Sequence, residues 1–170
     1  MESIIADIQD QVVETLERGL TDSSGSQRAK IEMLHTDDEF ELADYISDNQ
    51  RRVGRIPHAF VYGGSVVFQD ADSTGTFVTA EMPFRIFVAT RDASSNDQEI
   101  QHRKASKWAL YVAAALSGEA VKGEGTNQAY LEEPNVEPIS NTEQVALWEV
   151  RLTVTINLDT ELILNQLDNE

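Results

Sequence analysis

The 170-residue chain contains no cysteine, and this absence excludes both disulfide bonds and thiolate metal sites. It also has no apolar run close to the roughly 18 residues that a transmembrane helix needs. Its first residues, MESIIADIQDQ, carry acids where a secretory signal carries Lys or Arg. We therefore expect neither a signal peptide nor a membrane partner.

Cations are scarce as well. The chain has 13 Lys and Arg residues against 30 Asp and Glu residues, which gives a net charge of −17. Nonspecific DNA binding depends on clustered cations that displace counterions from the phosphates, so this composition argues against a duplex-binding protein. A hydrophobic content of 41% is nevertheless ordinary for a globular domain, and 170 residues suffice for one domain with a real core.

The few cations are unevenly spread. From Trp108 to the C-terminus only Lys122 and Arg151 are basic, against eleven acids. Two basic groups stand out earlier in the chain: Arg51, Arg52 and Arg55, and then Arg103, Lys104 and Lys107. They are either solvated or paired surface positions, or a subunit interface that meets acidic surface on another copy of the chain.

The sequence also lacks the patterns of an enzyme site. Its histidines, His35, His58 and His102, are widely separated, and no G-x-S-x-G elbow or phosphate-binding glycine loop is present. Pairs of carboxylates are common, but thirty acids make such pairs inevitable and select none of them as an acid and base. We therefore assign no catalytic, cofactor-binding or metal residue, and expect a protein that is not an enzyme.

One segment, DADSTGTFVTAE at 70–81, matches the spacing of a calcium-binding loop. The matching positions are Asp70, Asp72, Thr74, Gly75 and Glu81. Strand-like sequences flank the segment, however, whereas an EF-hand loop lies between helices, and Val78 has no side-chain oxygen at the ninth position. We predict a plain hairpin here, and a small acidic calcium- or partner-binding module is the alternative reading.

Two segments have the character of helices. In residues 3–20, apolar side chains that include Ile8, Val12 and Leu16 fall on one helical face, and Gly19 can end the helix. Residues 98–117 form the second helix, which Ser95, Asn96 or Asp97 can cap. Its expected buried face contains Trp108, Tyr111 and Val112, with Ala115 or Leu116, and its basic residues lie on the other side.

Strands are expected at 29–35, 59–62, 65–69, 82–92 and 147–159, whereas 37–52 fits either a helix or a loop. The last strand, LWEVRLTVTINLD, alternates apolar side chains with Glu, Arg and Thr side chains, which we expect to face water or a partner. Residues 118–146 read as a long polar loop. The predicted fold is a single α+β domain over 1–170, an antiparallel-rich β-sheet with two main helices packed on one face.

The order of these elements resembles the tail terminator, or tail completion, proteins of long-tailed viruses, particularly the Mu-like phages. The resembling pieces are spread over most of the chain, from Ile4 to Asp159. They are IIADIQDQVVETLERGL, IPHAFVYGG, MPFRIFVATRD, HRKASKWALYVAAALSG and LWEVRLTVTINLD. The long segment 118–146 and the calcium-like segment 70–81 do not belong to the shared pattern.

The resemblance implies structural work in a virion and no catalysis. Such proteins form a ring, usually hexameric, that caps the head-proximal end of the tail tube and meets the head connector. The implied partners are other copies of the chain, the tail tube protein and the head connector, with the virion tail as location and the host cytoplasm during assembly. A ring lined by acids would let DNA pass through its channel without specific binding, because like charges repel.

Overall fold

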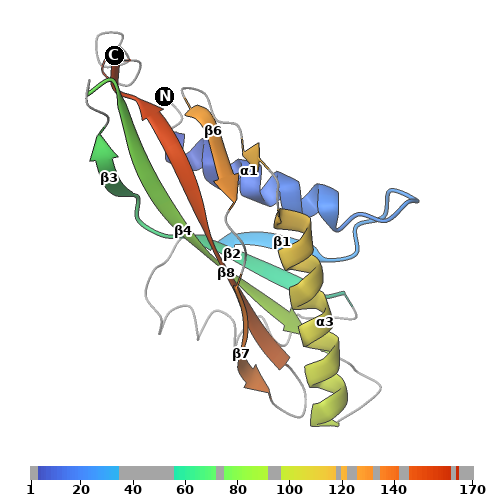
Figure 1. Cartoon of the computed structure of the whole chain (residues 1–170). Helices are drawn as coiled ribbons and strands as arrows, with labels where there is room; N and C mark the ends of the chain where they lie inside the picture. The colour runs from blue at the N-terminus through green and yellow to red at the C-terminus, as the bar shows by residue number, and fades with distance from the viewer. Residues whose placement is uncertain are drawn as a thin grey trace.

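The computed structural model describes residues 4–34, 56–71, 75–91, 97–117, 120–121, 126–131, 135–141, 146–161 and 164. These residues form two helices and eight strands, and the strands belong to one sheet (Figure 1). The helices are α1 (Ile4–Gly19) and α3 (Gln98–Leu116), and the strands are β1 (Lys30–Leu34), β2 (His58–Gly63), β3 (Val67–Ala71), β4 (Phe77–Thr90), β5 (Ala120–Val121), β6 (Thr126–Leu131), β7 (Asn135–Asn141) and β8 (Ala146–Asp159). The predicted segment 37–52 lies outside the described residues.

Strands β4 and β8 form the centre of the sheet. Each has 14 residues, and they pair antiparallel from Phe77 opposite Asp159 to Thr90 opposite Ala146 without a register shift. In the last strand apolar side chains alternate with polar ones, the period of a strand whose two faces meet different surroundings. Most of the shorter strands pair with one or the other strand of this long pair.

The shorter strands flank this pair on both sides. β2 and β3 pair with successive halves of β4, whereas β7 and β6 pair with successive halves of β8. Pro83 lies where β4 changes partner from β2 to β3, a place that suits a residue without an N–H to donate. Among the pairings of the described strands, only that of β1 with β2 is parallel.

Both helices cover the same face of the sheet (Figure 1). On α1, Ile8, Val12 and Leu16 recur at the spacing of one helical face, and all three are fully buried. They pack in one core with side chains from alternate positions of the central strands, among them Phe84 of β4 and Leu152 of β8. The predicted α+β fold, an antiparallel-rich sheet with two main helices on one face, is confirmed.

Helix α3 begins at one of the predicted caps, and the face that it turns to the core overlaps the predicted face in part. The Asp97 side chain accepts a hydrogen bond from the backbone N–H of Glu99 at 2.8 Å. The buried side chains are Gln101, Ala105, Ala109, Val112, Ala113 and Leu116. Val112 and Leu116 of the predicted buried face are confirmed, and Trp108 is half-buried and packs against the core, but the expectation is wrong for Tyr111, which is 44% exposed. The small alanine side chains let the helix lie close to the sheet, and the Tyr111 ring faces outward.

The two helices touch where α1 ends. A Cβ added to Gly19 would lie 2.6 Å from the Cβ of Ala115, which is closer than such atoms approach in proteins. Gly19 therefore allows the end of α1 to rest against α3, and the predicted end of the first helix is confirmed. Neither helix of the described residues is long and apolar enough to cross a lipid bilayer.

The sheet face turned away from the helices is buried in part. Phe60 is fully buried and Glu149 is only 1% exposed. Glu149 makes ion pairs with Arg85 and, at 2.8 Å, with Arg151. Arg151 also pairs with Glu137 of β7 at 3.1 Å. The expectation that the polar side chains of β8 meet water or a partner is therefore wrong for Glu149, whose charge is held by two arginines of the same chain.

The segment 118–146 is not one long loop, as the sequence analysis expected. It contains β5, β6 and β7, and the last two pair with β8. The strand character of β7 is hidden in the sequence because Asn135, Pro138 and Asn141 have low β-propensity. Pairing with the long strand β8 outweighs that local preference.

Candidate interaction surface

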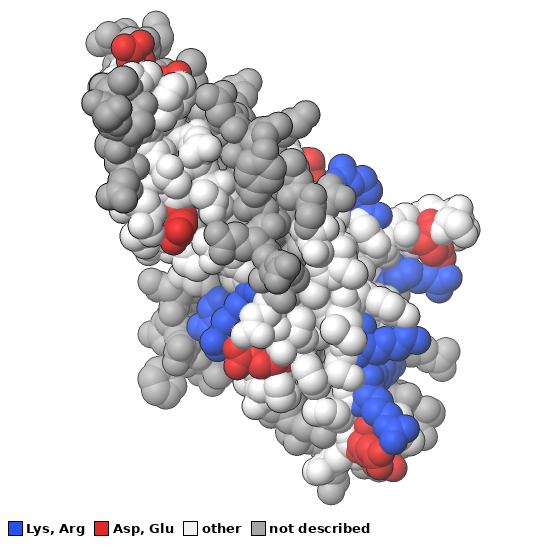
Figure 2. Space-filling model, viewed as in Figure 1, with Lys and Arg blue, Asp and Glu red and all other residues white. Residues whose placement is uncertain are grey.

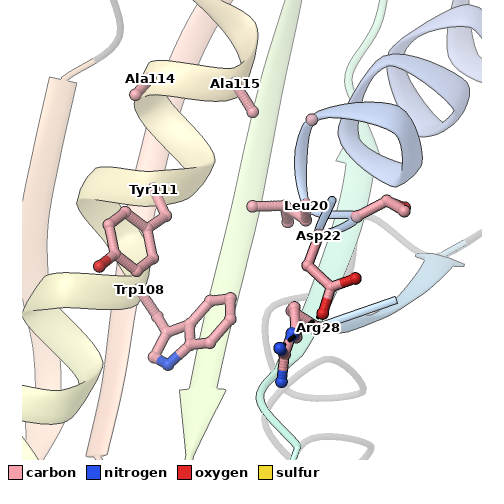
Figure 3. Close-up of a pocket in the computed structure, with 9 residues that line it drawn as sticks. Leu20, Asp22, Arg28, Trp108, Tyr111, Ala114 and Ala115 are labelled. Carbon is pink, nitrogen blue, oxygen red and sulfur yellow. Dashed lines mark ion pairs between the residues drawn. The ribbon is translucent and has the colours of Figure 1, made fainter. Parts of the chain in front are cut away.

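A pocket of about 390 Å³ lies between the end of α1 and the outer side of α3 (Figure 3). The residues that line it are Gly19, Leu20, Thr21, Asp22, Arg28, Trp108, Tyr111, Ala114 and Ala115. The two aromatic rings come from α3, and the charged pair comes from the turn that follows α1 (Figure 3). Most of the lining is apolar, so the pocket is suited to an apolar side chain.

Asp22 holds the turn that forms one wall of this pocket. Its Oδ1 accepts hydrogen bonds from the backbone N–H groups of Ser24 and Ser26, both at 2.9 Å. Its Oδ2 lies 2.5 Å from the guanidinium of Arg28. The Ser24 hydroxyl, followed by these other partners, lowers the pKa of Asp22 to about 2. Asp22 is thus a carboxylate with structural partners, and this pKa does not suit a general base near neutral pH.

Three neighbouring residues of α3 form the opposite wall and its rim. The rings of Trp108 and Tyr111 meet edge to face, with centroids 5.4 Å apart and planes at 86°. The Lys107 Nζ lies 5.6 Å from the centroid of the Tyr111 ring. A half-buried Trp beside an exposed Tyr and an exposed cation on a rigid helix is typical of protein interfaces. We call Leu20, Arg28, Lys107, Trp108 and Tyr111 the pocket surface.

The structure locates one of the two basic groups that the sequence singled out. Lys107 reaches the pocket surface, whereas the exposed Arg103 pairs with Glu99 one turn back on the same helix. The Nζ of Lys104 donates a hydrogen bond to the backbone carbonyl of Arg91 at 2.8 Å. The other group, Arg51, Arg52 and Arg55, lies outside the described residues. An interface role for either group stays a prediction.

Charge is distributed unevenly over the molecule. Lys and Arg gather along one edge in Figure 2, over α3 and the turn after α1. Among the described residues, 56–71, 75–84 and 152–161, which include β3 and the adjoining ends of β4 and β8, contain four acids and no Lys or Arg. The described part of this acidic chain therefore has a basic side and an acidic end.

The calcium-like residues 70–81 span a β-hairpin. Strand β3 ends at Ala71 and strand β4 begins at Phe77, so the predicted strand flanks are confirmed. Glu81, the last position of the calcium pattern, lies opposite Val67 and accepts a hydrogen bond from Gln69 at 3.0 Å. Residues 72–74 lie outside the described part of the chain.

We expect no specific calcium binding by this hairpin, because Glu81 belongs to a strand and Val78 offers no side-chain oxygen. Calorimetric titration of the whole chain with calcium at low ionic strength should give no saturable heat, and Glu81→Gln should give the same trace. An affinity of about 10 μM or tighter that Glu81→Gln abolishes would favour the binding-module alternative.

The other titratable clusters lie on the sheet away from the pocket. His58 Nε2 lies 3.0 Å from Glu32 Oε2, and burial, followed by the charge of Lys30, lowers the pKa of His58. His102 packs near Trp148, with ring centroids 5.1 Å apart, and His35 lies outside the described residues. In the part of the chain that the structure describes, no three His, Asp or Glu side chains are grouped as metal ligands.

Sequence reasoning missed the pocket because it placed both aromatic rings in the core. A signal was present in α3, where Ala105, Ala109 and Ala113 recur every fourth residue. Such a stripe of small side chains marks the face that packs closely, and it would have placed Trp108 at the edge of that face and Tyr111 at the surface. No signal in the sequence indicated that the turn after α1 would face these rings.

Comparison with known proteins finds likenesses among solved structures. No family model matches the chain, and no curated protein matches it in sequence. A chain from a solved structure described as the virion of a native gene transfer agent particle is 13% identical, with a TM-score of 0.50. The match covers 92% of this chain and 99% of that one. A second solved chain, 12% identical over 87% of this chain and 94% of its own length, has a TM-score of 0.43, too low for a conclusion.

Proposed function

We propose that this protein is a structural component of a virion and not an enzyme. The observation that carries the proposal is the likeness to a chain of a gene transfer agent virion, which extends over nearly the whole of both chains. A resemblance in the order of elements to tail terminator proteins supports the same class of function. The pocket surface, with its accessible aromatic rings and cations, supports contact with another protein.

In its finer form, the proposal is a tail terminator that caps the head-proximal end of a tail tube as a hexameric ring. Its partners would be other copies of the chain, the tail tube protein and the head connector. A net charge of −17 on each copy would discourage phosphate contacts, so DNA could pass through the ring without specific binding. The protein would then be located in the virion tail, and in the host cytoplasm during assembly.

Ring formation by so acidic a chain requires local attraction between copies. We expect the triple reversal of Arg103, Lys104 and Lys107 to Glu to reduce the number of completed tails of normal length in an assembly assay. Each exposed ion pair contributes up to about 1 kcal/mol, and several such pairs act together around a closed ring. At physiological ionic strength the charges act over about 8 Å, so only close contacts count.

Lys30→Glu is the matched control for this reversal, because Lys30 is an exposed lysine on β1, away from α3. Thermal unfolding of each variant shows whether the fold is intact, which matters because Lys104 bonds to the backbone of Arg91. Normal tails from a folded triple variant would mean that these cations are a solvated helix face with no part in assembly.

A further inference from the structure

Strand β3 exposes an apolar side chain on each face of the sheet. Val67 is 53% exposed and lies opposite Glu81, on the face turned away from the helices. Phe68 is 65% exposed and lies opposite the buried Ala80, on the face that the helices cover elsewhere. A surface that docked on one face would cover one of these side chains and leave the other in water. A partner that covers both must meet the strand from its side.

The side of β3 that points away from β4 is an open strand edge (Figure 1). Strand β1 covers the corresponding edge of β2, and its last pair is Leu34 opposite Tyr62. None of the described strands continues this row beside β3, which pairs with β4 on its other side. In an antiparallel pair, alternate residues direct their N–H and C=O groups away from the partner. The first residues of β3 therefore present backbone groups beyond the point where β1 ends.

The other edges of the described sheet carry features that discourage pairing with a further strand. β7 contains Pro138, which has no N–H to donate, and its register with β8 shifts after that residue. β5 has two residues, and β1 begins with the exposed Lys30, which pairs with Glu32. β3 has a register shift too, but the shift follows Phe68, so Val67 and Phe68 lie in the regular part of the ladder. Among these edges, β3 is the best suited to accept another strand.

We infer that β3 binds an extended segment of a different protein, which adds to the sheet as a further strand beside Val67 and Phe68. The unpaired backbone groups of a strand edge are matched by another extended backbone, whose alternating side chains cover both faces of the sheet. Such a segment carries apolar side chains at adjacent positions, one against Val67 and one against Phe68. The inference rests on the proposed virion role for the origin of the segment, which is a neighbouring protein of the particle.

The charge around β3 argues against a second copy of the chain and favours a basic segment. The described residues 56–71, 75–84 and 152–161 contain four acids, among them Glu81 opposite Val67, and no Lys or Arg. If β3 paired with β3 of a second copy, these acids would gather at a contact between two chains that each carry a charge of −17. A segment with Lys or Arg beside its apolar residues is instead attracted by the same acids.

Binding is tested on the whole chain with a short capped peptide of Val, Thr and Phe that has a lysine at each end. Its affinity is measured by fluorescence anisotropy, and hydrogen exchange of the backbone amides of the chain is followed by NMR. The first control is the same peptide with N-methyl groups along its backbone, which keeps the apolar side chains but prevents hydrogen bonding to a strand edge. The second control is the peptide with Glu in place of both lysines.

We expect the lysine peptide to bind and to slow the exchange of one of the two amides of Val67 and Phe68, because only alternate residues face the free edge. Both control peptides should bind more weakly, by about tenfold or more. Phe68→Lys should weaken binding of the lysine peptide to a similar extent, whereas Ile139→Lys, at an exposed position of β7, should leave it unchanged. Thermal unfolding shows whether each variant is folded.

Three results would overturn the strand edge as a binding site. They are an absence of peptide binding, binding that N-methylation does not weaken, and binding that leaves amide exchange at Val67 and Phe68 unchanged.

The origin of the segment is tested in particles that carry a photoreactive benzophenone side chain at position 67. Cross-linking to a different particle protein is expected, and an adduct of two copies of this chain would contradict the proposed partner. Particles that contain the protein but give no adduct would overturn the inference and leave the virion role standing. Peptide binding by a protein that is absent from particles would support the strand edge and contradict the virion role.

Discussion

Replacing Glu149 by alanine is expected to lower the free energy of unfolding by about 1–3 kcal/mol. Glu149 is only 1% exposed and is held by Arg85 and Arg151, so its removal leaves two guanidinium groups without their shared partner. Denaturant unfolding measures the change. Glu137→Ala is the matched control, because Glu137 pairs with the same Arg151 at 3.1 Å but its side chain is 40% exposed. That variant should lose at most about 1 kcal/mol.

The same group predicts how stability depends on pH. Burial alone would raise the pKa of Glu149, but hydrogen bonds and charge from Arg151 and Arg85 outweigh burial and lower it below its ordinary value of 4.5. The folded state therefore binds a proton less readily than the unfolded chain. The stabilisation is fully present above pH 4.5 and is lost as the pH falls through the lowered value. Glu149→Gln should flatten this acid limb of the stability profile, and an unchanged profile would contradict the assignment.

The second large effect is expected at Leu152. Its side chain is 4% exposed and packs in the core under the helices, so Leu152→Ala should cost about 2–5 kcal/mol of stability through lost burial and the cavity left behind. Thr153, the next residue of β8, points to the opposite face and is half-buried. Thr153→Ala should cost well under half as much. Equal losses in the two variants would show that the register of β8 is wrong.

The elements that were predicted best from the sequence are those in which apolar residues recur with a strong period. In β8 the alternation of residues 147–159 identified the helix-facing side chains, and Val150, Leu152 and Val154 are all buried. In α1 the spacing of Ile8, Val12 and Leu16 did the same. Periodicity works here because each element packs one face against a single core.

The wrong predictions have a common physical cause. Packing between segments that are distant in the sequence outweighs the conformational preference of the local residues. β7 contains Pro138 and two asparagines, yet it pairs with β8. Trp108 and Tyr111 are large and aromatic, yet alanines form the close contact of α3. Glu149 sits in a strand position that alternation assigned to solvent, and only the fold brings Arg85 of β4 beside it.

The candidate site could be predicted only in part. The sequence singled out the cluster of Arg103, Lys104 and Lys107, and the structure places Lys107 of this cluster at the rim of the pocket. The hollow itself depends on Gly19, which lets α1 end against α3, and on the Asp22 turn that carries Arg28 to the rim. These contacts join segments that lie far apart in the sequence. No sequence pattern within either segment indicates that it will contact the other.

The most direct test of the account is to locate the protein in particles from the cells that carry its gene. Purified particles are labelled with a gold-tagged antibody against this chain and viewed by electron microscopy, and unrelated particles are the control. The account predicts gold at one place on each particle, where the tail tube meets the head. Gold elsewhere on the particle would contradict a tail terminator, and particles that carry no gold, while the protein remains in the soluble fraction, would contradict a structural role in the virion.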